Sequence, residues 1–162
     1  MSKVARTENG IQVLVNSLIA VNGLAAQVGW FDGEKYENGT PVAYAAAISE
    51  FGCPEGGIPA RSFMRTTIAE KKGSWKNLAK SGAKAILAGN ADARAVMEGV
   101  SLQAAGDIRK KISQITSPAL KPGTIAARKA KLAKGKKVGG LTKPLVESGL
   151  MLASLSSAVI TK

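Results

Sequence analysis

Histidine is absent from this 162-residue chain, and its absence removes whole classes of chemistry. Without an imidazole the chain cannot build a Ser-His-Asp triad, use histidine as a general base, or form most kinds of zinc site. The single cysteine, Cys53, has no partner for an internal disulfide, which is typical of a protein made in a reducing compartment. We therefore expect no cofactor and no structural metal.

The sequence also gives little support for catalytic pairs that do not require histidine. Asp32 with Glu34 offers a pair of carboxylates, and Ser74 with Lys76 offers a nucleophile beside a base. Neither pair lies in a motif that would position it, and solvated loop residues are the simpler interpretation. The sequence predicts a protein that is not an enzyme.

Aromatic residues and long apolar runs are scarce as well. Aromatics make up 4% of the chain, so the core is expected to consist of Ala, Val, Leu and Ile. No stretch is long and apolar enough to cross a bilayer. Lys3 and Arg6 precede an apolar run as in a signal peptide, but Glu8, Gln12 and Asn16 interrupt that pattern. We expect neither secretion nor a membrane partner.

What the chain has in excess is positive charge. It carries 23 basic and 11 acidic residues, a net charge of +12. Such a balance suits a polyanionic partner, or neutralises acidic neighbours in an assembly. The excess is greatest in residues 121–143, because no acidic residue lies between Asp107 and Glu147.

Two interpretations of residues 121–143 stay open. The segment is either a mobile, solvated basic loop or an arm that orders on a neighbouring subunit or on nucleic acid. No aromatic residue lies in it, so contacts to DNA would be to phosphates, without sequence readout and strongly dependent on salt. The candidates for facing DNA or a partner are Arg128, Lys129, Lys131, Lys134, Lys136 and Lys137.

Hydrophobic periodicity predicts an α+β fold in a single domain over residues 1–162. A small antiparallel sheet is expected to pack with two long helices and shorter ones. The predicted helices cover residues 8–22, 41–51 (with Thr40 as cap), 66–87 and 91–115, and a short one begins near Ser148. Strands are predicted at residues 25–31 and 158–161, and they are expected to pair with each other.

A stiff elbow separates the helix ending at Phe51 from the next helix. Gly52 is placed as a helix stop with a positive φ, and two prolines restrict the loop that follows. The simple interpretation is a connection with solvated arginines. The alternative is a contact surface, because arginine and aromatic residues are enriched at interface anchors. The interface candidates are Phe51, Pro59, Arg61, Phe63 and Arg65, and Glu50 is expected to face solvent or a partner.

Three segments in the same order resemble a known family. Ala47-Ile-Ser-Glu-Phe-Gly followed by Ile58-Pro-Ala-Arg-Ser-Phe-Met-Arg65 is similar to a "hEFG … IPARPFLR" signature. Leu120 to Lys129 resembles "L.P.TI.RK", and Lys143 to Leu155 resembles "KPLIDTG.L..SI". These signatures belong to neck and tail-completion proteins of tailed bacteriophages, the HK97 gp10-like and Mu G-like morphogenesis groups. Ser49, Ser62 and Glu147-Ser148 depart from them.

The resemblance implies a structural virion protein. Such a subunit forms a ring at the head-tail junction, completes or terminates the tail tube, and is assembled in the host cytoplasm. Its implied partners are further copies of itself, the tail tube protein, the head connector and, without specificity, packaged DNA. The resemblance implies either a six-fold ring of the protein alone or a monomer that closes into such a ring only on the tail tube. A non-sequence-specific nucleic-acid-binding module is the alternative that the charge alone supports.

Overall fold

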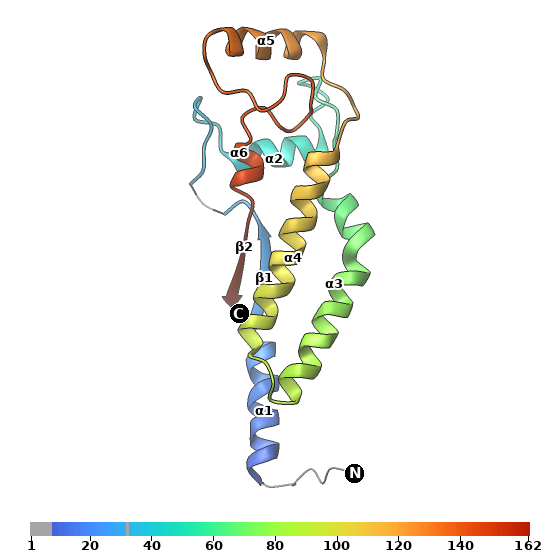
Figure 1. Ribbon diagram of the computed structural model, residues 1–162, viewed down its shortest axis with the longest axis vertical. Coiled ribbons are helices and arrows are strands. Elements are labelled where there is room, and N and C mark those ends of the chain that lie inside the picture. The colour runs from blue at the N-terminus through green and yellow to red at the C-terminus, as the bar shows by residue number, and fades with distance from the viewer. Residues whose placement is uncertain (1–7, 32) are drawn as a thin grey trace. The chain divides into compact units, whose positions relative to one another are not determined.

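The computed structural model describes residues 8–31 and 33–162, and this part of the chain contains six helices and two strands (Figure 1). The predicted α+β class is confirmed. The elements in chain order are α1 (Glu8–Asn22), β1 (Leu24–Gly29), α2 (Val42–Phe51), α3 (Met64–Leu87), α4 (Ala93–Gln114), α5 (Pro122–Ala133), α6 (Leu150–Ala153) and β2 (Ser156–Thr161). Both predicted long helices are therefore present, as α3 and α4.

The described residues divide into two compact units. Unit 1 contains residues 8–28, 72–104 and 157–162, and unit 2 contains residues 29–71 and 105–156. The helices α3 and α4 each contribute residues to both units. The prediction of one domain over residues 1–162 did not anticipate this division.

Unit 1 joins the sheet to one end of the α3–α4 pair. Strands β1 and β2 are hydrogen-bonded neighbours and run antiparallel, which confirms the predicted pairing (Figure 1). Gly82 of α3 lies against Val96 of α4: a Cβ at Gly82 would come within 2.2 Å of Val96 Cγ1. The missing side chain therefore lets the two helices approach closely.

Unit 2 holds most of the buried apolar side chains. Trp30 and Phe63 meet edge to face with ring centroids 5.7 Å apart, and the indole N–H of Trp30 donates to the Met151 carbonyl at 2.9 Å. The other buried apolar residues of this unit are Val42, Ala46, Ala105, Ile108, Ile112, Pro144 and Leu155. The spacing of the apolar residues in 91–115 predicts that Ile108 and Ile112 lie on one side of the helix, and both are buried in α4.

Two local predictions are wrong. Thr40 does not cap α2, because the cap position is Pro41, which makes no side-chain hydrogen bond. Residues 121–143 are not a loop throughout, because residues 122–133 form the helix α5. The sequence PGTIAARKAKLA combines proline at the first turn with strong helix formers, and Gly135 follows with φ of 74°. The high charge of the segment favoured the prediction of a loop, although its residue types favour a helix.

Candidate functional site

The elbow between α2 and α3 is organised by a buried carboxylate. Glu50 is 5% exposed and accepts hydrogen bonds from the Ser62 hydroxyl at 2.7 Å and from the backbone N–H groups of Phe63, Met64 and Arg65 at 2.8, 2.8 and 3.1 Å. It therefore caps the N-terminus of α3, where a negative charge is favourable. Burial raises the pKa of Glu50, but these hydrogen bonds outweigh it and hold the pKa below 4.5.

The expectation that Glu50 faces solvent or a partner is therefore wrong. The cap comes from a residue 12 to 15 positions before its donors, across the whole elbow. Local cap patterns place the capping residue directly at the helix end, so they give no signal for such a distant one.

The loop of the elbow is closed by backbone contacts. Cys53 and Ile58 exchange two hydrogen bonds, Cys53 N–H to Ile58 O at 2.8 Å and Ile58 N–H to Cys53 O at 2.9 Å. Gly52 has φ of 80°, as predicted, and a Cβ there would lie 2.8 Å from the Ala60 nitrogen. Only glycine fits such a position without a backbone shift. The elbow is thus held in one conformation by its own chain.

Two predicted interface residues lie inside unit 2. Arg61 and Phe63 are 8% and 1% exposed. Arg61 donates from Nε to the Pro118 carbonyl at 2.7 Å and from Nη2 to the Ala119 carbonyl at 3.1 Å. Burial lowers the pKa of Arg61, and a nearby positive charge, Arg128, lowers it further. This corrects the expectation that Arg61 and Phe63 make subunit contacts, since both side chains are covered within the chain.

The remaining elbow candidates lie at the surface. Phe51 is 65% exposed, and the Arg65 guanidinium carbon lies 4.7 Å from the centroid of its ring. Arg65 is itself held by Glu50, with Nε 2.9 Å from the carboxylate. Pro59 is half-buried. The pair of Phe51 and Arg65 therefore remains available to a partner, and its geometry is fixed by the elbow.

The side of α2 that carries Phe51 is apolar along its length. We call Tyr44, Ala47, Ile48 and Phe51 the α2 outer face. Three of these side chains are exposed, Ile48 is half-buried, and the opposite side of α2 buries Val42, Ala46 and Glu50. Tyr44 was not among the predicted interface residues, although its spacing of seven residues from Phe51 places both on one side of a helix.

The basic segment contains one arginine with an internal role. Arg128 is 5% exposed and donates from Nη1 to the carbonyls of Gly140 and Lys143, both at 2.7 Å. Its Nε lies 3.6 Å from the Glu147 carboxylate. Arg128 therefore ties α5 to the returning chain at residues 139–147. Its prediction as a residue that faces DNA is corrected, because its side chain is covered.

The five lysines predicted to face DNA or a partner are exposed, and they differ in their partners. Lys131 pairs with Glu147, and Lys136 pairs with Glu37 at 2.6 Å. Among the described residues, Lys129, Lys134 and Lys137 make no ion pair. We call these three the free lysines. Of the five candidate lysines, these three are available to a polyanion or to an acidic surface.

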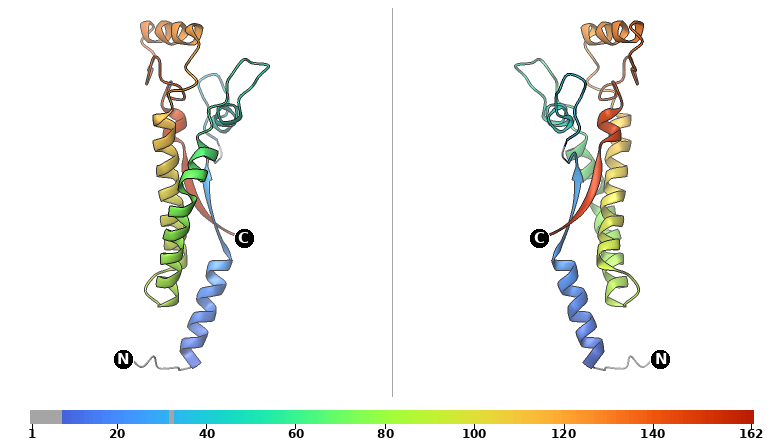
Figure 2. Two further views of the ribbon diagram at one scale, coloured as in Figure 1. Left: turned by 90° about the vertical axis from the view of Figure 1, so that its right-hand side faces the viewer. Right: turned by 90° about the vertical axis from the view of Figure 1, so that its left-hand side faces the viewer.

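Helix α1 is the least covered element of unit 1. Figure 2 shows it leading into β1, with its N-terminal turns standing clear of α3 and α4. Among its described side chains none is buried, and Val13 on another side is also exposed. Four large apolar residues on one side of α1, each between 40% and 65% exposed, are named the α1 stripe: Ile11, Val15, Leu18 and Ile19.

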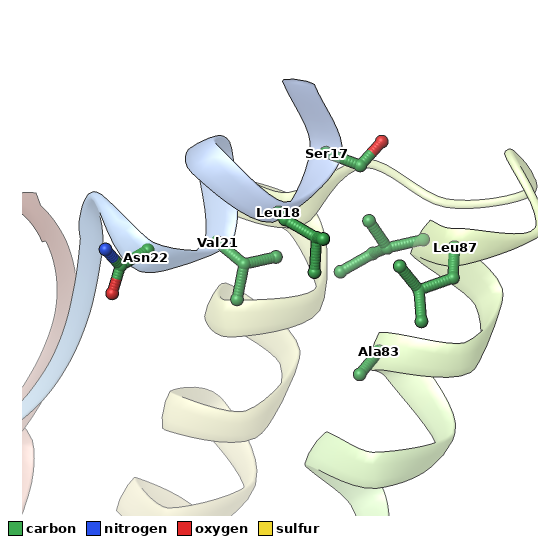
Figure 3. Close-up of a pocket in the computed structure, with 7 residues that line it drawn as sticks. Ser17, Leu18, Val21, Asn22, Ala83 and Leu87 are labelled. Carbon is green, nitrogen blue, oxygen red and sulfur yellow. The ribbon is translucent and has the colours of Figure 1, made fainter. Parts of the chain in front are cut away.

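The C-terminal half of α1 forms one wall of an apolar hollow in unit 1. Figure 3 shows Leu18 and Val21 of α1 facing Leu87 of α3 across it. The hollow has a volume of about 280 Å³ and opens to solvent. Its lining residues are Ser17, Leu18, Val21, Asn22, Ala83, Ile86 and Leu87. Incomplete packing of α1 against α3 therefore leaves apolar surface exposed on both helices.

Of the two pairs considered for catalysis, the structure describes both members of one, Ser74 with Lys76. Asp32 lies outside the described residues. Ser74 and Lys76 are two positions apart on α3, so their side chains point in different directions. In the described part of the chain, no group of acidic residues and cysteine could hold a metal ion.

The described helices include none that is long and apolar enough to cross a membrane. No protein-family model, no curated protein and no solved structure matches this chain. The function is therefore argued from the surfaces described above and from the motifs in the sequence.

Proposed function

We propose that this protein is a structural subunit that assembles with identical copies into a ring at the head-tail junction of a tailed bacteriophage. In that role it completes or terminates the tail tube and joins it to the head connector. The three sequence segments support the location. The exposed α1 stripe is the observation that best supports assembly of identical copies.

An isolated helix with the length of α1 is not expected to be stable in water. Its 15 residues are near the length at which even favourable sequences are marginally helical, and most helices in proteins depend on packing of an apolar face. The α1 stripe has little of that packing in its own chain, because its four side chains are between 40% and 65% exposed. Covering its side chains would contribute on the order of 25 cal/mol per Å² of apolar surface. A neighbouring subunit provides such a cover.

A closed ring requires two different surfaces on each copy, because every subunit contacts its neighbours through unlike faces. The chain has two unlike apolar surfaces, the α1 stripe in unit 1 and the α2 outer face in unit 2. Both are exposed. This arrangement suits heterologous contacts, and the six-fold copy number comes from the family resemblance.

The free lysines suit the surroundings of such a ring. Lys129 lies on α5, and Lys134 and Lys137 follow it. Repeated around a ring, they would supply positive charge to packaged DNA in a central channel or to acidic faces of adjacent rings. The same three residues are what favours the alternative function, non-specific nucleic-acid binding by a single chain.

Electron microscopy of the negatively stained purified protein tests the proposal. We expect closed rings with a central channel, and we expect them without added DNA. A titration with duplex DNA over a range of salt concentrations separates the alternative. Tight binding by a monomer that weakens steeply with salt would favour the nucleic-acid-binding module and contradict the ring subunit.

A further inference from the structure

We propose that α1 of one copy docks on the α2 outer face of the next copy. This inference rests on the proposed function and identifies its subunit contact. It commits to one occupant for both exposed surfaces, a second copy of this chain.

The two surfaces match in length and in pattern. On α1, Ile11 and Leu18 are seven residues apart, and on α2, Tyr44 and Phe51 are also seven apart. At 1.5 Å per residue, each pair spans about 10 Å of helix. Between the two aromatic rings lies Ala47, whose small side chain leaves room for an apolar side chain from the other helix. An amphipathic helix placed against such a surface is a recurring mode of recognition.

The α2 outer face has the composition of an interface anchor. Tyr44 and Phe51 are 60% and 65% exposed, although the chain has few aromatics. Tyr, Phe and Arg are the residue types enriched at the centres of interfaces, where water is excluded. Arg65 already lies over the Phe51 ring, held there by Glu50. The anchor is therefore fixed before a partner arrives, which lowers the entropic cost of binding.

Charge complementarity selects α1 as the segment that fits this surface. Each copy carries a net charge of +12, so contacts between basic surfaces of two copies are unfavourable. Helix α1 contains no Lys or Arg, and its one acidic residue is Glu8. The α2 outer face, by contrast, is bordered by the exposed Arg65. Docking α1 there therefore places no cation of α1 beside Arg65.

Cysteine cross-linking distinguishes a second copy from other occupants of the two surfaces. In a Cys53→Ser background, one chain carries Val15→Cys in the α1 stripe. A second chain, with a tag of different mass, carries Ala47→Cys in the α2 outer face. The two are co-expressed, mildly oxidised, and analysed by intact mass. Asn16→Cys replaces Val15→Cys as the matched control, because Asn16 lies on the polar side of α1 with Gln12.

The expected result is a covalent dimer of mixed mass with Val15→Cys, and its loss with Asn16→Cys. A dimer of two Val15→Cys chains would overturn the inference, because α1 would then pair with α1. A chain carrying both cysteines that cross-links at monomer mass would also overturn it, since α1 would be covering its own α2.

Native mass spectrometry of the same samples separates this inference from the proposed function. Rings that form without the mixed cross-link would refute docking of α1 on α2 and leave the ring subunit intact. Chains that remain monomeric at every concentration would refute the ring subunit, and the docking with it.

Discussion

The elbow of unit 2 and helix α1 of unit 1 differ in how far their side chains are covered by their own chain. At the elbow, Glu50 caps α3 from within the chain, and Arg61 and Phe63 are covered. In α1, large apolar side chains are left exposed. From this difference we infer that the elbow maintains the fold of the subunit, whereas α1 provides a contact surface for another chain. Substitutions in the two regions should therefore affect different measurements.

The largest effect on folding is expected from Glu50→Ala. The substitution leaves the N–H groups at the start of α3 and the Ser62 hydroxyl without their acceptor. Hydrogen bonds to charged groups contribute more than neutral ones, so the free energy of unfolding should fall by about 3–5 kcal/mol. Urea denaturation followed by circular dichroism measures it. Glu55→Ala, in the exposed elbow loop, is the control, and equal losses in the two variants would refute the cap.

A smaller loss is expected from Arg128→Ala. It removes the donors to the Gly140 and Lys143 carbonyls, so the chain at residues 139–147 loses its tie to α5. We expect the free energy of unfolding to fall by about 2 kcal/mol. Lys129→Ala changes the adjacent residue, which is exposed, and should stay within about 0.5 kcal/mol of the original protein. If Lys129→Ala were the more damaging, Arg128 would not have the structural role assigned here.

Acidification should weaken the elbow in a defined direction. The pKa of Glu50 is lower in the folded chain than its ordinary value of 4.5, so its contribution to stability is complete above pH 4.5. That contribution is lost as the pH falls through the folded pKa. Urea midpoints measured from about pH 6 to about pH 3 should therefore fall, and those of Glu50→Gln should fall less. Parallel curves for the two proteins would show that Glu50 does not contribute.

The smallest effect on folding is expected from Ile11→Ser combined with Leu18→Ser. These side chains are 63% and 52% exposed, so the free energy of unfolding of the dilute monomer should change by less than about 0.5 kcal/mol per site. Ring formation should nevertheless be lost, as measured by size-exclusion chromatography with light scattering. Gln12→Ser with Asn16→Ser is the matched control on the polar side of α1. Rings that persist in the variant with Ile11→Ser and Leu18→Ser would show that α1 is not part of the subunit contact.

Local patterns predicted the helices and strands well, because periodicity and helix-stop residues act over a few positions. The α4 face containing Ile108 and Ile112, the positive φ of Gly52, and the pairing of β1 with β2 all follow from such signals. The bounds of α2 and of α1 were also close to those found.

The side-chain roles were harder to predict, because they depend on contacts between distant residues. Glu50 meets its donors only after the elbow has folded, and Arg128 reaches carbonyls 12 and 15 residues away. Sequence alone does not distinguish an arginine that binds phosphate from one that binds backbone carbonyls. The fold is needed to tell them apart. Charge alone identified the lysines of residues 121–143 as a group, but it did not show which of them form ion pairs, and it did not reveal α5.

Sedimentation equilibrium of the purified chain over a wide range of concentrations tests the central claim most directly. The account predicts a mass that rises from 16.7 kDa at high dilution to a closed multiple of that value and then stops rising. A mass of 16.7 kDa at every concentration would contradict it, because an exposed α1 would then need no second copy.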